Sequence, residues 1–168
     1  MLSPKKVMDS RVQVTQIMYP EYANPSGNVN GGHILKLVDE AAGIVAVRHS
    51  RRNCVTASVD RMDFLSPVYV GDLLFAKASI NYVSRTSMEV GVRIEAECLR
   101  TGTHFHVGSA YLTFVALDVD GKPIEIPKLS LENEQEQRRF EEAEKRREAR
   151  LKEAKQHSKR NESSCVKS

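Results

Sequence analysis

The sequence of 168 residues lacks several features that define other classes of protein. It has no tryptophan and only three cysteines, Cys54, Cys98 and Cys165, which are widely spaced and form no Cys-x-x-Cys pair. This spacing suits neither a disulfide-stabilised secreted domain nor a zinc site, so we expect Cys54 and Cys98 to be small core residues. The longest apolar run, residues 41–47, is too short to cross a bilayer. We therefore expect a cytoplasmic protein without membrane insertion.

A large excess of charge of one sign is also lacking. The chain carries 25 Lys and Arg against 22 Asp and Glu, a net charge of +3, and nucleic-acid binding would require a stronger basic excess. The sequence contains no phosphate-binding P-loop. It also contains no Gly-x-Ser-x-Gly elbow, and this absence argues against an α/β-hydrolase mechanism. His104 and His106 could share one face of a strand, but no third ligand lies near them in the sequence. Neither a metal nor nucleic acid is an expected partner.

What the sequence does contain is one long apolar helix pattern among strand-like runs. Strict alternation or β-rich composition predicts the strands, and turn residues separate them. The last four strands follow one another closely, which favours antiparallel meander pairing over parallel crossovers. The expected segments are a strand at 11–17, a helix at 33–49, and strands at 54–64, 73–84, 87–99 and 104–117. The pattern predicts an α+β domain over residues 1–130, with a curved five-stranded sheet around one long central helix.

The composition changes at residue 131. Residues 132–157 are nearly all good helix formers, and opposite charges recur at helical spacing, as in Glu141 with Lys145. We expect residues 131–168 to form a charged helical tail with a disordered end from residue 159. Its few apolar residues favour a solvated helix, and a partner-binding helix is the alternative.

Asp39 lies in the middle of the predicted apolar helix. Because the helix is apolar nearly all round, we expect the sheet to wrap it and to bury this carboxylate. An unpaired buried charge is costly, so Asp39 must be paired, hydrogen-bonded or used in chemistry. From position alone, a purely structural role and a catalytic role are both open.

A polar, glycine-rich loop from Asn24 to Gly32 leads into the start of this helix. Free backbone N–H groups and the positive end of the helix dipole meet there, so Gly31 and Gly32 could hold an anion or a developing oxyanion. The alternative is an ordinary loop with an asparagine cap.

These residues resemble the signature of a known family. The stretch Asn24-Pro-Ser-Gly-Asn-Val-Asn-Gly-Gly-His-Ile-Leu-Lys-Leu-Val-Asp-Glu-Ala-Ala-Gly43 is similar to hotdog-fold acyl-CoA thioesterases of the cytosolic acyl-CoA hydrolase type. Later blocks occur in the same order: Asp63–Asp72, Arg85–Met88 and Ala110–Asp118. The resemblance covers about residues 7–128 and leaves the charged tail outside it. Some family members have a histidine where this chain has Asn30.

The resemblance implies a function and a site. It implies an enzyme that hydrolyses fatty acyl-CoA to a free fatty acid and CoA, with Asp39 as general base or nucleophile and Asn24 assisting. It places the thioester carbonyl at the Gly31 and Gly32 amides. No cofactor is expected beyond coenzyme A as part of substrate and product. The implied partners are the acyl-CoA substrate and further copies of the chain, because hotdog units form homodimers that commonly assemble into hexamers.

A turn between two predicted strands, Arg85, Thr86 and Ser87, resembles the part of the family that contacts coenzyme A. Arg85 could pair with a phosphate and the two hydroxyls could bond the pantetheine or phosphate oxygens. The alternative is an ordinary hairpin tip.

Two other functions stay open. A non-catalytic acyl-CoA sensor or scaffold would use the same fold, since fold alone does not give function. A dehydratase-type hotdog protein would place an aspartate and a histidine on one helix face, but His33 precedes Asp39 by a spacing that does not.

Overall fold

The structure, a computed structural model, describes residues 2–165, and it describes the side chains of residues 2–153. The chain divides into two compact units, one ending at Leu131 and the other beginning at Glu132. The two units are described separately. No helix among the described residues is long and apolar enough to cross a membrane.

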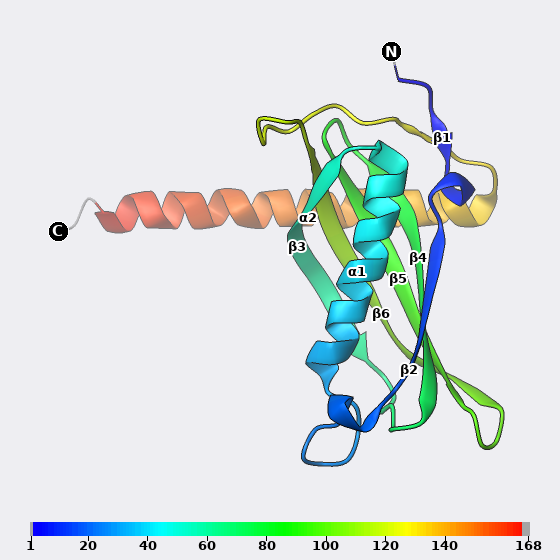
Figure 1. Ribbon diagram of the computed structural model, residues 1–168. Helices are drawn as coiled ribbons and strands as arrows, with labels where there is room; N and C mark the ends of the chain where they lie inside the picture. The colour runs from blue at the N-terminus through cyan, green and yellow to red at the C-terminus, as the bar shows by residue number, and fades with distance from the viewer. Residues whose placement is uncertain (1, 166–168) are drawn as a thin grey trace. The chain divides into compact units, whose positions relative to one another are not determined.

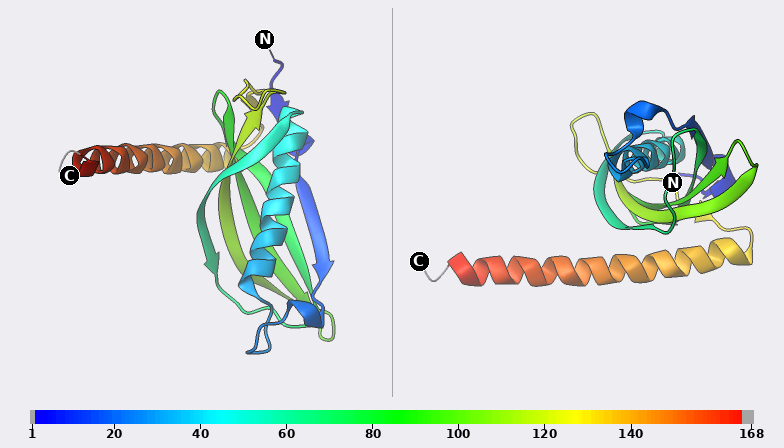
Figure 2. Two further views of the ribbon diagram at one scale, coloured as in Figure 1. Left: turned by 60° about the vertical axis from the view of Figure 1, so that its left-hand side comes forward. Right: turned by 90° about the horizontal axis from the view of Figure 1, so that it is seen from below.

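The first unit is a five-stranded antiparallel sheet that curves around one helix, α1 (Figures 1 and 2). The spatial order of the strands is β2-β4-β5-β6-β3. Each of these five strands begins and ends within one residue of the position that the sequence pattern predicts. The elements are β2 (Val12–Ile17), α1 (Gly31–Ser50), β3 (Asn53–Phe64), β4 (Asp72–Val83), β5 (Ser87–Cys98) and β6 (Thr103–Leu117).

The expectation of a meander through the last four strands is correct only for β4, β5 and β6. Strand β3 does not pair with β4 but lies at the far edge of the sheet, beside β6. Seven connecting residues, 65–71, can span about 23 Å when extended, whereas β3 and β4 are three strand spacings or about 14 Å apart. The connection is therefore long enough to cross the open end of the sheet. This arrangement lets the sheet close around α1 from both sides.

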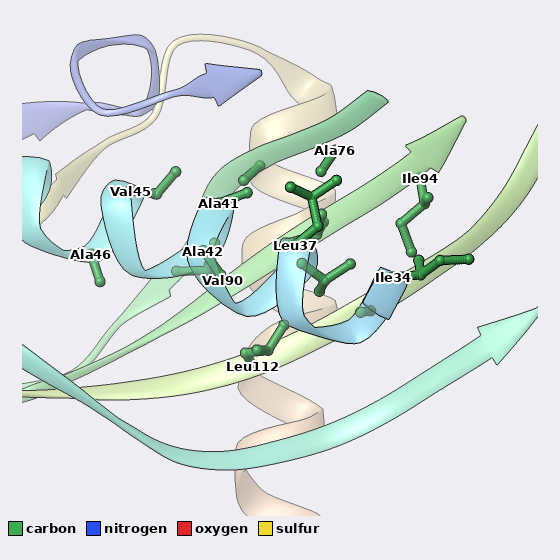
Figure 3. Packing of buried hydrophobic residues seen from close by; sticks show 14 of the residues in the cluster. Ile34, Leu37, Ala41, Ala42, Val45, Ala46, Ala76, Val90, Ile94 and Leu112 are labelled. Carbon is green, nitrogen blue, oxygen red and sulfur yellow. The ribbon is translucent and has the colours of Figure 1, made fainter. Parts of the chain in front are cut away.

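The core lies between α1 and the concave face of the sheet (Figure 3). The helix side of the core combines larger side chains with alanines, which let the strands approach closely. Buried residues on α1 are Ile34, Leu37, Val38, Ala41, Ala42, Val45 and Ala46, and those on the strands include Leu74, Ala76, Val90, Ile94 and Leu112. Burial of each large aliphatic side chain contributes about 1.5–3 kcal/mol of hydrophobic stabilisation.

The sheet wraps α1 as predicted, but it leaves part of the helix exposed in the single chain. Ile44 and Val47 on α1 are 44% and 45% exposed, and Val55 and Val59 on the edge strand β3 are also exposed. The exposed surface of α1 therefore includes these apolar residues as well as the polar residues Lys36 and Glu40, which form a 3.7 Å ion pair.

Both ends of α1 are fixed by specific hydrogen bonds. At the start, Asn30 is the N-cap and its Oδ1 accepts a 2.8 Å hydrogen bond from the amide of Gly32, so the helix begins at Gly31 rather than at His33. At the end, Arg51 adopts a left-handed conformation with φ 57°. The ammonium group of Lys5 donates a 2.6 Å hydrogen bond to the carbonyl of His49.

Short elements lie near both ends of α1. Strand β1 (Lys5–Lys6) pairs in parallel with β7 (Leu129–Ser130), and neither two-residue strand is predicted from the sequence. Two 3-10 turns, η1 (Val7–Asp9) and η2 (Pro20–Tyr22), flank β2. The side chain of His49 is completely buried, and its Nε2–H donates a 2.7 Å hydrogen bond to the carbonyl of Pro127.

The second unit is a single helix, α2 (Glu134–Cys165). The side chain of Asn133 accepts a hydrogen bond from the amide of Glu136, which caps the helix start. Arg138 and Glu142 form an i,i+4 ion pair of 3.5 Å, in keeping with the predicted charged helix. The predicted disorder from residue 159 is not found at 159–165, which are helical; residues 166–168 lie outside the described residues.

Candidate active site

Asp39 is half-buried on α1 and has one defined partner. The hydroxyl of Thr56, on β3, donates a 2.8 Å hydrogen bond to Oδ1 of Asp39. The pairing of β3 with β6 is interrupted between Thr56 and Ser58, and such an irregularity redirects side chains locally. The structure therefore holds the carboxylate in a fixed orientation and leaves its second oxygen, Oδ2, available for chemistry.

Sequence reasoning missed Thr56. A threonine in a β-rich run is an ordinary strand residue, and nothing in the local pattern connects it with a carboxylate seventeen positions earlier. The contact follows from the placement of β3 beside α1, which is a long-range property of the fold. The sequence offered one signal that Asp39 needs a partner elsewhere in the fold, namely a carboxylate in an apolar helix without a partner in that helix.

Asn24 lies in a tightly closed loop before α1. Its side-chain Oδ1 accepts a 2.9 Å hydrogen bond from the amide of Ser26, and its backbone bonds both to Gly27 and to Asn28. Gly27 has φ 85°, a conformation that favours glycine, which explains why this loop needs it. Because Oδ1 is occupied within the loop, the Nδ2 group is the part of Asn24 that remains to act on a ligand, as a hydrogen-bond donor.

The amides at the helix start are not equivalent. The Gly32 amide bonds to the Asn30 side chain, and the His33 amide bonds to the Asn30 carbonyl at 3.0 Å. Of the two glycine amides predicted to bind the thioester oxygen, only the N–H of Gly31 is therefore free, because it has no acceptor among the described residues. This N–H also lies at the positive end of the dipole of α1.

Gly31 and Asn24 line the same hollow, which has a volume of about 340 Å³. Polar and apolar residues both line the hollow, and among them Phe64, at the end of β3, is exposed. A Cβ added at Gly31 would lie 3.4 Å from the Phe64 ring, so glycine permits this close approach. The residues that line this hollow are Asn24, Asn28, Val29, Gly31, Ile34, Phe64, Leu65, Ser66, Pro67 and Val68.

Asp39 is not at this hollow within the same chain. It follows Gly31 by eight residues, so it lies about 12 Å further along the helix axis at 1.5 Å per residue. The side chain that holds it, Thr56, comes from the part of β3 nearer the other end of α1.

The predicted coenzyme A contacts, Arg85, Thr86 and Ser87, are also distant from the helix start. They form the turn between β4 and β5, near the end of α1 rather than its beginning (Figure 1). The carbonyl of Arg85 accepts a hydrogen bond from Ile126 and that of Thr86 accepts one from Ala116, so the turn is anchored through its backbone. The Arg85 side chain is exposed and unconstrained by these bonds. One chain alone thus presents three separate parts of the predicted site.

The other candidates show no reactive arrangement. His104 lies 3.4 Å from Glu97, His106 bonds to the carbonyl of Gly108, and no cluster of three potential metal ligands occurs among the described residues. Cys54 packs against the core, and burial raises the pKa of its thiol. Cys98 lies at the end of β5 outside the core, contrary to expectation, and a hydrogen bond with Thr101 lowers the pKa of its thiol.

The fold and these groups define a hotdog-fold protein with a hydrogen-bonded aspartate and a helix-start amide. A family model described as the thioesterase superfamily matches residues 26–104. An uncharacterised acyl-CoA thioester hydrolase of Bacillus subtilis, YkhA, is 38% identical over 76% of this chain and 74% of its own length. The cytosolic acyl coenzyme A thioester hydrolase of Rattus norvegicus is 36% identical over 83% of this chain, which spans 37% of that protein.

Solved structures agree with these relatives. The crystal structure of an apo-hexameric acyl-CoA thioesterase has a TM-score of 0.87 and 37% identity, covering 91% of this chain and 98% of that one. The acyl-CoA hydrolase of Staphylococcus aureus, solved with butyryl coenzyme A, coenzyme A and coenzyme A disulfide, has a TM-score of 0.85 and 33% identity, covering 97% and 99%. The same enzyme has been solved with an Asp, an Asn and a Thr each replaced by Ala. The chain belongs to the thioesterase superfamily, among the acyl-CoA thioester hydrolases of the hotdog fold.

Proposed function

We propose that this protein hydrolyses fatty acyl-CoA to a free fatty acid and coenzyme A. The observation that carries the proposal is the Asp39 carboxylate: Thr56 bonds to its Oδ1 at 2.8 Å, and its Oδ2 has no partner among the described residues. Thioester hydrolysis needs a polarised carbonyl and an activated water or a carboxylate nucleophile, and residues of this chain can supply both requirements without a further cofactor.

In the proposed reaction the thioester carbonyl accepts a hydrogen bond from Gly31 N–H, which stabilises the negative charge that develops on its oxygen. Acting as general base, Asp39 takes a proton from a water molecule through Oδ2, and the hydroxide adds to the carbonyl carbon. The C–S bond then breaks, and the thiolate of coenzyme A leaves with the proton that Asp39 had accepted, which regenerates the carboxylate. Asn24 orients the water or assists the oxyanion through Nδ2.

Asp39 could instead attack the carbonyl carbon directly and expel the thiolate of coenzyme A, which forms an acyl-aspartyl anhydride; water then hydrolyses the anhydride to the fatty acid and free Asp39. The two routes differ in whether solvent oxygen enters the protein, because only water that attacks the aspartyl carbonyl of the anhydride leaves its oxygen in Asp39. A single turnover in ¹⁸O-water leaves Asp39 unlabelled if it acts as base; after several turnovers, labelled Asp39 would identify it as the nucleophile.

We further propose that two chains build each active site. The separation of about 12 Å along α1 between Gly31 and Asp39 is too long for one chain to place both on the same thioester. The exposed apolar residues Ile44 and Val47 on α1 provide a surface that a second chain would cover. A two-fold axis would then bring Asp39 of one chain to the Asn24 loop of the other.

The comparisons support this assembly and these residues without assigning them. Two neighbours are described as hexameric acyl-CoA thioesterases, in keeping with homodimers that associate further into a hexamer. In the Staphylococcus aureus enzyme, the three substituted residues have the same separations along the sequence as Asn24, Asp39 and Thr56 have here. In the assembled protein Arg85, Thr86 and Ser87 would hold the phosphate or pantetheine oxygens of coenzyme A. We propose a cytoplasmic location, as the name of the rat relative states for that protein.

The decisive experiment is a panel of acyl-CoA substrates of different chain length, assayed by release of the free thiol. We expect saturable hydrolysis of at least one chain length. Negligible rates at all lengths, together with measurable coenzyme A binding, would replace the enzyme by the non-catalytic sensor.

A further inference from the structure

An aromatic ring borders the hollow that contains Asn24 and Gly31. Among the described residues that line this hollow, Phe64 alone is aromatic, and it is 50% exposed. A phenylalanine side chain offers a large apolar surface, so an apolar group of a ligand that covers the ring is held there by the hydrophobic effect. Phe64 is therefore a candidate contact for an apolar part of the substrate.

The ring lies beside the one free amide at the helix start. A Cβ at Gly31 would lie 3.4 Å from Cζ and 3.6 Å from Cε2 of Phe64. Apart from α1 itself and the adjacent Asn30, no other described residue comes within 4 Å of that position. In an α-helix both the Cα–Cβ bonds and the N–H groups lean toward the N-terminus, so the ring borders the space in front of Gly31 N–H.

A substrate bound at this amide comes close to the ring. A carbonyl oxygen that accepts a hydrogen bond from Gly31 N–H lies about 2.7–3.2 Å from the nitrogen. The carbons next to that carbonyl then lie within van der Waals reach of Phe64. No other side chain that lines the hollow has a comparable position relative to Gly31 in the described part of the chain.

The backbone of Phe64 is held in place before any substrate binds. Phe64 is the last residue of β3 and pairs with Gly108 of β6. A Cβ at Gly108 would collide with the carbonyl oxygen of Asp63, so glycine permits this close approach of the two strands. The amide of Leu65 donates a 2.7 Å hydrogen bond to the carbonyl of Val107. These contacts fix the point from which the ring projects.

The two ends of an acyl-CoA make different demands on the hollow. The coenzyme A arm carries polar amides and phosphates, and it must leave the hollow to reach Arg85, which is distant from the helix start. The acyl chain is the free, apolar end of the substrate. The buried residues that line the hollow are all aliphatic, namely Val29, Ile34 and Val68. The hollow therefore suits the acyl end.

We propose that Phe64 is a specificity-determining residue, whose ring packs against the first carbons of the acyl chain while the thioester oxygen is bonded to Gly31 N–H. The inference rests on the proposed thioesterase function and deepens it, because it names the part of the substrate that the ring recognises. Each methylene that reaches the ring adds apolar contact, so Phe64 favours butanoyl-CoA over acetyl-CoA.

The test measures kcat/KM for butanoyl-CoA and for acetyl-CoA in the parent protein, Phe64→Ala and Phe64→Leu. We expect the butanoyl-to-acetyl ratio to fall about fourfold in Phe64→Ala, because burial of one methylene changes such a constant by about this factor. The ratio should fall less in Phe64→Leu, which keeps an apolar side chain. The matched control is Leu99→Ala, because Leu99 is 49% exposed and does not line this hollow; its ratio should change less than twofold.

Binding of coenzyme A separates this role from a contact with the pantetheine arm. Coenzyme A lacks the acyl chain, so its Kd, measured by calorimetry, should change less than twofold in Phe64→Ala. Weaker coenzyme A binding with an equal loss of activity on both esters would show that the ring holds the arm and would overturn the proposal. An unchanged butanoyl-to-acetyl ratio in a variant that circular dichroism shows to be folded would overturn it as well.

Failure of the proposed function gives a different result. If the parent protein hydrolyses neither ester, the thioesterase function itself fails. In that case the affinities of the parent protein and Phe64→Ala for butanoyl-CoA and acetyl-CoA, measured by calorimetry, give the same ratio. We expect the substitution to lower it, and a ratio that stays the same would overturn the role of Phe64.

Discussion

Acidification should destabilise the folded chain through one residue, His49, at the end of α1. Its side chain is 0% exposed, and Nε2–H donates to the carbonyl of Pro127, so the neutral imidazole carries its proton on Nε2. The other ring nitrogen, Nδ1, is buried without a hydrogen-bond partner among the described residues. Protonation at Nδ1 would therefore bury a cation whose new N–H has no acceptor.

Burial lowers the pKa of His49 below its usual 6.5, and the Lys5 cation adds to this lowering, whereas the bond to Pro127 and the charge of Asp9 oppose it. The unfolded chain consequently binds more protons at this site than the folded chain, so stability falls as the pH drops below about 6.5. It stops falling once the pH is below the pKa of the folded state. A single proton changes the free energy of unfolding by at most about 1.4 kcal/mol per pH unit, and this slope applies only below about pH 6.5. The loss of stability between pH 7.5 and 5.5 is therefore at most about 1.4 kcal/mol.

Urea unfolding at pH 7.5, 6.5 and 5.5, at one fixed protein concentration, measures this effect. The His49→Gln variant keeps a side-chain N–H donor and cannot titrate, so its stability should change less over this range than that of the parent protein. The exposed His104 provides the control, because His104→Gln should retain the parent's loss. If the difference between the parent and His49→Gln is the same at all three pH values, His49 is not buried in the neutral state and the reasoning is refuted.

Three further predictions concern the site and the core. Thr56→Val, which removes the hydroxyl bonded to Asp39, should lower kcat about 10-fold, whereas Thr56→Ser should keep most of the activity; equal rates in the thiol-release assay would contradict the pairing. Mixed Asn24→Ala and Asp39→Asn subunits should regain activity once exchange occurs, because one of the two sites in the heterodimer is intact; an inactive mixture with proven exchange would place each site within one chain. Leu112→Ala, at a fully buried position, should cost about 2–5 kcal/mol in urea unfolding, and a cost below 1 kcal/mol would argue against its place in the core.

The sequence predicted local elements well because their signals are local. Alternation and turn residues placed each strand of the five-stranded sheet within one residue. The apolar pattern located α1 apart from its first two residues, which the Asn30 cap adds, and its last residue. Strand order was not predictable in the same way. The position of β3 beside β6 depends on closure of the sheet around α1, and no local periodicity encodes that pairing.

In the candidate site, too, residues with a local sequence signal were predicted and those that depend on long-range contacts were not. Asp39 stands out because a carboxylate interrupts an apolar helix, and the loop from Asn24 to Gly32 stands out through its glycines and its place before that helix. Thr56 does not stand out, since its link to Asp39 is a contact across the fold. The half-burial of Asp39 was also not foreseen, because the pattern shows which residues are apolar but not whether the same chain or another covers them.

The most direct test of the account is the rate of thioester hydrolysis by Asp39→Asn, measured beside Glu40→Gln. Both changes remove one negative charge from adjacent positions of α1, but Glu40 is exposed and pairs only with Lys36 among the described residues. We predict that Asp39→Asn folds, binds coenzyme A and loses at least ~100-fold in kcat, equivalent to about 2.7 kcal/mol of transition-state stabilisation, because an amide serves neither as base nor as nucleophile. Glu40→Gln should stay within twofold of the parent protein. Turnover at the parent rate in folded Asp39→Asn would contradict the central claim that this carboxylate performs the chemistry.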